Sequence, residues 1–472
     1  MRRAFVAAFL VASACLATVG ISPAVAQTQR VTPQSKGEAL LSFSPVVKQA
    51  QPAVVNVYAS RTDVRPRNPL FDDPIFERFF GRRGEQPGGP TAQSLGSGVI
   101  VEAAGFVVTN NHVIDGMTDV KVALADKREF EADIVLRDPR TDLAVLKIKN
   151  GGAAFPTLEL GDSDALEVGD LVLALGNPFG VGQTVTQGIV SALARTNVGT
   201  SDYGFFIQTD AAINPGNSGG ALVDMHARLI GVNSAIYSKS GGSVGIGFAI
   251  PVNMVKTVVA AAKSGGKLVR RPWLGATMQN VSKEIADSLG LDRPTGALIT
   301  DLVEKSPAAE AGLKRGDLIV SIDGQSVADP EALGFRLGTK PLGGAASLSV
   351  LRAGKQIVAP IKLVVAPETP ARDAIKLKSS SPLRGATVIN LSPAVVEEFG
   401  VEGLRAGVIV GELDEGSNAQ AMNFQKGDVI LAVNDTKIAN TRDVETATAK
   451  GRYLWKITIG RNGQVFTTVV GG

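Results

Sequence analysis

The chain has 472 residues, which is enough for about three domains at roughly 150 residues per domain. Hydrophobic residues make up 44% and charged residues 20%, which excludes wholesale disorder, and the 53 Gly and 24 Pro favour short strands joined by turns. A net charge of +3 gives no indication of nucleic-acid binding, the single Cys excludes an intrachain disulfide, and two His argue against a zinc site.

The first 26 residues have the pattern of a secretory signal. Arg2 and Arg3 are followed by an apolar run over 4–21 and by an A-x-A motif at 24–26. This order predicts a signal peptide cleaved after Ala26, with a retained membrane anchor as the alternative. No later run of 18 uncharged apolar residues follows, so we expect no stable membrane span and a location outside the cytoplasm.

The next part of the chain, up to about residue 267, has the pattern of a β-rich domain. A Val-rich strand is expected over 52–59, and the polar, Gly-, Pro- and Arg-rich stretch over 61–93 is too long for a hairpin and predicts a functional loop. Between 96 and 250, about ten short β-rich runs separated by turn residues indicate one or two antiparallel barrels or sandwiches. A helix over 252–262 and a linker over 264–267 complete this part.

The remaining chain contains an internal repeat. GATM at 275–278 recurs as GATV at 385–388, GALI at 296–299 as GVIV at 407–410, and RGDLI at 315–319 as KGDVI at 426–430. Three segments in one register indicate two copies of a unit of about 90 residues, which is a compact domain rather than a solenoid repeat. The copies begin near Arg271 and Leu383, and residues 367–381 link them.

The strongest local signal for chemistry is NPGNSGG at 214–220. Glycines on both sides of Ser218 allow a tight backbone that presents a hydroxyl and neighbouring N–H groups to one point, although the segment could also be a plain turn. A nucleophilic serine needs a base. His226 falls in a predicted hairpin turn, whereas His112 follows a strand that can hold it firmly, so His112 is the better candidate.

A carboxylate should orient the imidazole. Asp142 opens a predicted strand and is the first choice. Asp115 lies three residues from His112 and could instead stabilise the local turn, and Asp138 and Asp210 are lesser candidates. The order His112, Asp142, Ser218 is the chain order of chymotrypsin-type triads.

The segments TNNHVI, TDLAVLKI, GNPFG and GNSGGALV, followed by the two repeats, closely resemble those of the HtrA/DegP (peptidase Do) serine proteases. The resemblance covers essentially all of the chain after residue 26. It implies a mainly β fold, with a chymotrypsin-like double β-barrel over 27–267 and two α+β PDZ domains over 271–367 and 382–472. It implies a triad of His112, Asp142 and Ser218, and an oxyanion hole made by the N–H groups of Gly216, Asn217 and Ser218.

The resemblance also implies a substrate-binding surface. The strand over 231–238 would pair with the substrate backbone by strand addition. The expected substrate-binding residues are Ile213, Ser234, Ala235, Ile236, Tyr237 and Ser238. Ile213 and Ile236 match positions that line the family's small apolar P1 pocket, which favours cleavage after Val, Ile or Ala, but both could be ordinary barrel core. Arg195 matches the family's regulatory sensor-loop arginine, or is a solvated loop charge.

A PDZ domain binds a peptide at an open strand edge, and a loop of N–H groups holds the C-terminal carboxylate. In the first repeat the expected carboxylate loop comprises Pro272, Trp273, Leu274, Gly275 and Ala276. The second repeat keeps the glycine as Gly385 but has Arg384 at the preceding apolar position, which weakens the case for peptide binding there. Either repeat could be a folding module without a ligand, and in the family the second PDZ domain serves mainly in assembly.

The resemblance therefore predicts a periplasmic, ATP-independent serine endopeptidase that degrades unfolded or misfolded envelope proteins, with PDZ-regulated activation and chaperone activity. Expected partners are unfolded polypeptides and peptide C-termini, with no nucleic acid, cofactor or metal. Family members form trimers through aromatic contacts near the N-terminus, so a homotrimer, and larger cages, are expected. The available aromatic residues are Phe43, Tyr58, Phe71, Phe76, Phe79 and Phe80.

Two other functions are compatible with parts of the sequence. A holdase chaperone or PDZ scaffold with minor proteolysis is the alternative, although all three triad positions are filled. A lipase or esterase is disfavoured because no G-x-S-x-G elbow joins a strand to a helix.

Overall fold

The computed structural model describes residues 42–61, 92–149, 152, 154–177, 183–195, 204–214, 216–236, 245–401 and 403–471. The predicted signal peptide over 1–26 and all but the ends of the predicted loop over 61–93 lie outside these ranges. Within the described ranges, no helix combines the length and the apolar character needed to cross a membrane.

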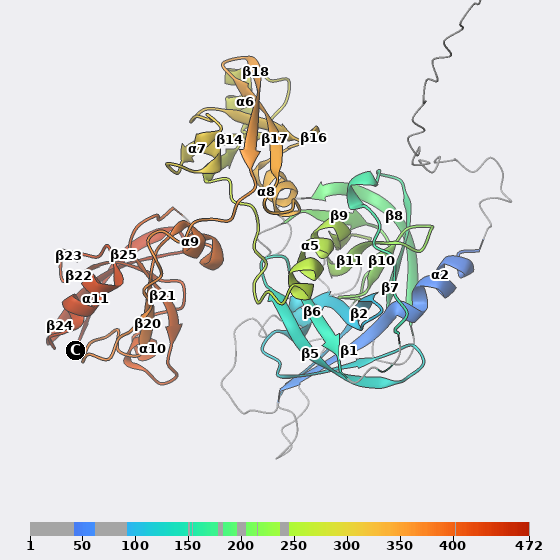
Figure 1. Ribbon diagram of the computed structural model, residues 1–472, viewed down its shortest axis with the longest axis horizontal. Helices are drawn as coiled ribbons and strands as arrows, with labels where there is room; N and C mark the ends of the chain where they lie inside the picture. Colours follow the sequence, from blue (N-terminus) through green and yellow to red (C-terminus); the bar gives the residue numbers. More distant parts are fainter. Residues whose placement is uncertain are drawn as a thin grey trace, which may run out of the picture. The chain divides into compact units, whose positions relative to one another are not determined.

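The first barrel is built from six antiparallel strands (Figure 1). They pair in the order β1-β2-β3-β6-β5-β4, and β4 pairs back to β1, so closure leaves neither edge of this sheet open. Val57, Ile100 and Leu146 have no exposed surface and belong to the apolar core. The strands are β1 (Val54–Arg61), β2 (Ala92–Glu102), β3 (Phe106–Asn110), β4 (Asp119–Ala123), β5 (Glu129–Asp138) and β6 (Leu143–Ile148), with α2 (Ser44–Ala50), the 3-10 turn η1 (Gln51–Ala53) and α4 (Asn111–Ile114) beside them.

The second barrel repeats this architecture with the order β10-β11-β12-β9-β8-β7, closed by pairing of β7 with β10. The two closed barrels confirm the predicted double-barrel fold, and the long helix after β12 was also predicted. The elements are η3 (Ser163–Ala165), β7 (Leu171–Gly176), β8 (Thr184–Arg195), β9 (Phe206–Thr209), β10 (Ala221–Val223), β11 (Leu229–Ile236), β12 (Gly247–Pro251) and α5 (Val252–Lys263).

The first repeat forms a six-stranded sheet with the path β13-β14-β15-β17-β18, and β16 pairs with β15. Its core contains Ile299, Leu333 and Leu348, all with at most 1% of their surface exposed. The elements are β13 (Ala276–Asn280), α6 (Lys283–Leu289), β14 (Ala297–Leu302), α7 (Pro307–Glu310), β15 (Leu318–Ile322), β16 (Gln325–Ser326), α8 (Pro330–Gly338), β17 (Ala345–Arg352) and β18 (Lys355–Lys362).

The second repeat forms a seven-stranded sheet with the path β19-β20-β21-β22-β24-β25, and β23 pairs with β22. It matches the first repeat strand for strand, but carries one additional strand, β19, before the first matching strand. The elements are β19 (Ile375–Lys376), β20 (Ala386–Asn390), α9 (Pro393–Phe399), β21 (Val408–Leu413), α10 (Asn418–Ala421), β22 (Val429–Val433), β23 (Thr436–Lys437), α11 (Thr441–Thr448), β24 (Leu454–Arg461) and β25 (Gln464–Gly471).

The two repeats also share the contacts that fix their helices. A short polar side chain caps the N-terminus of each matching helix by accepting a backbone N–H, which satisfies one of the unpaired donors there. The matched caps are Ser282 and Ser392, Ser306 and Ser417, and Asp329 and Asn440. The repeat found in the sequence is therefore a repeat of local structure as well as of residue types.

The aspartate of the RGD and KGD motifs is buried in each copy and forms an ion pair with a partly exposed arginine. Asp317 is 1% exposed and accepts hydrogen bonds from Nε and Nη2 of Arg352, both at 2.6 Å. Asp428 is 1% exposed and accepts the same two bonds from Arg461, also at 2.6 Å. Both pairs are bidentate, which adds geometric specificity to the attraction and ties β17 and β24 to the motif turns.

We predict that Asp317→Ala destabilises the first repeat by about 1–3 kcal/mol, because it removes a buried carboxylate that accepts two hydrogen bonds from Arg352 and the backbone N–H of Lys314. Lys362→Ala is the control, because it breaks a pair with Glu310 that is largely exposed and should cost at most about 1 kcal/mol. Urea unfolding followed by tryptophan fluorescence measures both, since Trp273 lies in this repeat. Equal stability of the two variants would contradict the prediction.

Candidate active site

His112 is held at the point where β3 ends. Asn110 is still extended, and the next residues form the short helix α4, which carries His112. Its neighbours Val113 and Ile114 have at most 2% of their surface exposed and anchor this turn in the first barrel. The imidazole, which is 36% exposed, therefore projects from a fixed backbone.

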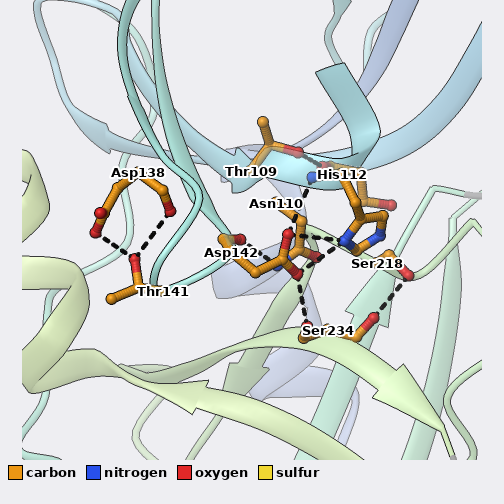
Figure 2. A network of polar contacts seen from close by, with 9 residues as sticks. Thr109, Asn110, His112, Asp138, Thr141, Asp142, Ser218 and Ser234 are labelled. Atoms are coloured by element: carbon orange, nitrogen blue, oxygen red, sulfur yellow. Dashed lines mark hydrogen bonds and ion pairs between the residues drawn. The ribbon is translucent and has the colours of Figure 1, made fainter. Parts of the chain in front are cut away.

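Asp142 lies beside His112, just before β6, with a positive φ of 56°. Its carbonyl accepts the N–H of Asn111 and the side-chain amide of Asn110, each at 3.0 Å. Its Oδ1 accepts the backbone N–H of His112 at 3.0 Å, and its Oδ2 lies 2.8 Å from His112 Nδ1 (Figure 2). The carboxylate thus favours the tautomer with the proton on Nδ1, which leaves Nε2 as the acceptor.

His112 and Asp142 shift each other's pKa. Burial by itself would lower the pKa of His112, but the charge and the hydrogen bond of Asp142 outweigh it, so the pKa of His112 is raised. Burial by itself would raise the pKa of Asp142, but His112 and the other donors outweigh it, so the pKa of Asp142 is lowered. Asp142 therefore stays ionised at neutral pH and stabilises a protonated imidazole.

Ser218 lies in a turn whose backbone has positive φ at the two flanking glycines, Gly216 and Gly219. Gly216 and Gly219 have φ values of 97° and 82°. A Cβ on Gly219 would lie 2.1 Å from the carbonyl oxygen of Ser97, which is closer than atoms can approach. The glycines around Ser218 are therefore required by packing as well as by backbone conformation.

The N–H groups of this turn are not all equivalent. Asn217 donates its N–H to the carbonyl of Asn214 at 3.0 Å. Within the described residues, by contrast, no carbonyl accepts the N–H of Gly216 or of Ser218. Of the three predicted oxyanion donors, Gly216 and Ser218 are thus the two whose N–H groups are available to an added oxygen.

Ser97 joins the two barrels at this turn and was missed by the sequence analysis. It lies on β2 of the first barrel, and its hydroxyl donates to the carbonyl of Gly216 at 2.5 Å and accepts the N–H of Asn177 at 2.8 Å. Its N–H donates to the carbonyl of Ser218 at 2.8 Å. Nothing in the segment SLGSGVIV distinguishes this serine from any other strand residue.

Ser234 on β11 contacts two of the predicted catalytic residues (Figure 2). Its hydroxyl donates to Asp142 Oδ2 at 2.9 Å, and its carbonyl accepts the hydroxyl of Ser218 at 3.1 Å. Among the described residues, no hydrogen bond links Ser218 to His112. The sequence placed Ser234 on the substrate strand but gave no signal for its bond to the carboxylate.

The other carboxylates that the sequence left open have different surroundings. Asp138 accepts the hydroxyl of Thr141 at 2.5 Å and pairs with Arg271, and Asp210 accepts the N–H of Ile189 at 2.7 Å. Asp115 contributes a charge that helps to raise the pKa of His112, after the larger effects of burial and of Asp142. Asp142 is the carboxylate that the structure brings against the imidazole.

Some of the remaining predicted residues are among the described residues, and others are not. Ile213 is 1% exposed and packs in the core of the second barrel. In the first repeat, Leu274 is 5% exposed, Trp273 donates its N–H to the carbonyl of Val364, and Gly275 has a φ of 72°. The side chains of Arg195, Ala235 and Ile236, and all of Tyr237 and Ser238, lie outside the description.

Taken together, the site contains an oriented imidazole, an ionised carboxylate, a hydroxyl on a tight turn and two available N–H groups. This set can remove a proton from a hydroxyl and stabilise a negatively charged oxygen. Among the described residues, no group of three or more His, Cys, Asp or Glu side chains is arranged to hold a metal ion.

Comparison with known proteins gives three domain matches. Residues 96–232 match the trypsin-like peptidase domain, and residues 298–341 and 385–470 each match a PDZ domain. The chain is 38% identical to the periplasmic serine endoprotease DegP of Escherichia coli (strain K12), over 90% of this chain and 91% of that protein. It is 40% identical to a probable periplasmic serine endoprotease DegP-like of Pseudomonas putida (strain W619), over 86% and 87%.

A solved structure shows the same similarity. The HtrA-type protease AlgW with a decapeptide is 46% identical, with a TM-score of 0.51, and the match covers 69% of this chain and 99% of that chain.

We predict that Asp142→Asn lowers the pKa of His112 relative to the parent protein, because the charge and the hydrogen bond that outweigh burial are removed and only the smaller effect of Asp115 still opposes it. In the parent protein the pKa of His112 should lie above its ordinary value. NMR of the imidazole carbons measures both, and with two His in the chain the exposed His226 provides the second signal as an internal reference. An unchanged His112 titration in the variant would contradict the geometry described above.

Proposed function

The chain belongs to the DegP family of periplasmic serine endoproteases, and we propose that His112, Asp142 and Ser218 are the catalytic triad of its peptidase domain. The enzyme is a serine endoprotease with a trypsin-like peptidase domain and two PDZ domains. The observation that supports the assignment is that Asp142 contacts His112 twice, at the backbone N–H and at Nδ1 of the imidazole.

In the proposed reaction, the hydroxyl oxygen of Ser218 attacks the scissile carbonyl carbon while His112 Nε2 takes the hydroxyl proton. The carbonyl oxygen becomes an oxyanion that accepts the N–H groups of Gly216 and Ser218. Collapse of this intermediate breaks the peptide C–N bond, and His112 returns the proton to the leaving amine. Water then repeats the sequence on the acyl-enzyme, with the same histidine as base and acid, and releases Ser218.

Substrate is proposed to bind along β11. Pairing of β11 with β10 stops at Val232, and the register with β12 shifts between Asn233 and Ala235. We infer that an extended substrate adds to the strand beyond that point and donates an N–H to the carbonyl of Ser234, as in other strand-addition complexes. That carbonyl then stops accepting the Ser218 hydroxyl, which can turn towards His112.

The finer properties are also proposals. The names of the relatives support a periplasmic location. We further propose that residues 1–26 are removed and that unfolded or misfolded envelope proteins are the substrates. Ile213 beside the active turn supports a small apolar P1 residue, with Ile236 as its predicted partner. We also propose an additional chaperone activity, a homotrimeric assembly able to form larger cages, and a regulatory role for Arg195.

The alternative is a holdase or PDZ scaffold in which proteolysis is minor. It keeps the binding surfaces but does not use the triad, so it predicts protection of unfolded proteins with little cleavage in the parent protein. The variant Ser218→Ala separates the two functions, because only the proteolytic function depends on the hydroxyl of Ser218.

We predict that Ser218→Ala lowers the rate of β-casein cleavage at least about 10⁴-fold, because the nucleophile is lost, while casein binding is retained. Ser288→Ala, which removes an exposed hydroxyl in the first PDZ domain, is the matched control and should cleave at the parent rate. Gel-based cleavage assays and anisotropy of labelled casein give the two quantities. Parental cleavage by Ser218→Ala would overturn the triad, and no cleavage by the parent under any condition would favour the scaffold.

We predict that a peptide with a free aliphatic C-terminus stimulates casein cleavage several-fold, because its carboxylate binds the loop at 272–276 and shifts the enzyme to its active state. The C-terminally amidated peptide lacks the charge that the loop holds and should have little effect. Initial rates at saturating concentrations of each peptide test this. Equal stimulation by both peptides, or by neither, would contradict PDZ-regulated activation through carboxylate capture.

A further inference from the structure

The two PDZ domains differ at the strand edge where a peptide would bind. In the first domain, β13 ends the path of its sheet, and among the described residues no strand pairs with its outer edge. In the second, the corresponding strand β20 pairs on its outer edge with β19. Strand β19 comes from the segment 367–381 that precedes the second domain, so the chain covers its own binding edge.

The covering segment runs in the direction that a bound peptide takes. Strand β19 is antiparallel to β20, with Ile375 opposite Val388 and Lys376 opposite Thr387. Leu377 follows, and its N–H donates to the carbonyl of Ala386 at 2.9 Å. The segment therefore runs towards the loop that precedes β20, where a PDZ domain holds the end of its ligand.

Leu377 takes the position of a ligand's last residue. The N–H of Gly385, the glycine of the predicted carboxylate loop, donates to the carbonyl of Leu377 at 2.9 Å. A bound carboxylate would accept from this same N–H group. Within the described residues of the first domain, the N–H of the matching Gly275 meets no backbone carbonyl.

The side chain of Leu377 is buried as an anchor residue would be. It is 2% exposed and belongs to the core cluster of the second domain, together with Leu383, Val388 and Trp455. Lys376, by contrast, forms an exposed ion pair with Asp414. The alternation of a buried and an exposed side chain is that of a strand lying on an apolar groove.

Contacts further upstream fix the segment on both sides of the groove. Asn390 at the end of β20 donates its N–H to the carbonyl of Arg372 at 2.8 Å. Across from β20, Asp373 accepts the hydroxyl of Thr441, the first residue of α11, at 2.9 Å, and pairs with Arg442 at 3.2 Å. The segment is thus bonded both to β20 and to the start of α11 (both labelled in Figure 1).

We propose that Ile375, Lys376 and Leu377 are a built-in ligand of the second PDZ domain. The groove is a latent binding site for peptides that end in leucine or a similar aliphatic residue with a free carboxylate. Such a peptide competes with the segment 372–377 and, unlike it, brings a second carboxylate oxygen and a negative charge to the loop at 383–386. The first domain is open to peptides at rest, and the second opens when its segment leaves.

The test is hydrogen exchange with mass spectrometry on the full mature chain carrying Ser218→Ala, which prevents self-cleavage. The opening variant is Leu377→Asp, which puts a charge in an apolar groove. Lys456→Ala is the matched control because it removes only an exposed ion pair with Asp435, elsewhere in the second domain. The probes are a peptide ending in Ile-Lys-Leu with a free carboxylate and its amidated form.

We expect exchange at 386–388 to rise roughly tenfold in Leu377→Asp and to stay at the parent rate in Lys456→Ala. The free-acid peptide should restore protection in Leu377→Asp, and the amidated peptide should not. In the parent, the free-acid peptide should protect 276–280 of the first domain and leave 386–388 unchanged. The last comparison separates this proposal from the proposed function. If the peptide fails to protect 276–280 only, peptide binding by the first domain is contradicted and the proposal for the second domain is not.

Continued protection of 386–388 in Leu377→Asp would overturn the proposal. The proposal would also be overturned if the free-acid peptide failed to restore protection of 386–388 in Leu377→Asp while β24 remained protected. If exchange in β24 also rises, the variant has lost the core of the domain, and Leu377→Ala is used in its place. Failure of the peptide to restore protection in Leu377→Ala then overturns the proposal.

Discussion

The candidate active site lies where the two barrels meet, and a few hydrogen bonds across that junction set its geometry. Ser97 of the first barrel bonds through its hydroxyl and its N–H to the turn that carries Ser218 in the second. In the opposite direction, Ser234 of the second barrel donates to the carboxylate of Asp142 in the first. His112 and Ser218 lie on different barrels, so their separation is determined by these contacts. A small shift at the junction changes the reacting distance, and reaction rates are sensitive to such misplacement.

The same junction explains why the resting hydroxyl of Ser218 does not bond to His112. The carbonyl of Ser234 is an acceptor at 3.1 Å, and it lies on the strand that we propose to bind substrate. Under this proposal, one acceptor serves the hydroxyl at rest and a substrate N–H during binding. Hydrogen bonds between catalytic groups often form only in the substrate complex, which agrees with the proposed exchange. We propose that ligand binding acts on the active site through this exchange of donors at the Ser234 carbonyl.

Much of the fold and of the site could be predicted from the sequence, for identifiable reasons. The repeat register at offsets near 110 predicted two matching domains, and the strand that precedes His112 distinguished it from the exposed His226. Ser97 and the hydroxyl of Ser234 could not be predicted, because their roles depend on pairing between residues far apart in the chain. The strand β19 was also not predicted, because two residues of a presumed linker carry no periodic signal. The Arg384 position did indicate that the second domain differs from the first.

The most direct test of the junction is the rate at which a fluorophosphonate probe modifies the mature protein, measured by mass spectrometry of the labelled peptide. Ser218 should be the modified residue, because it is the hydroxyl that we propose His112 activates. Ser97→Ala, which removes a hydroxyl that contacts neither His112 nor Asp142 in the described hydrogen bonds, should slow this labelling about ten- to hundredfold. Labelling of a different serine, or an unchanged rate in Ser97→Ala, would contradict a catalytic site assembled and held by the contact between the barrels.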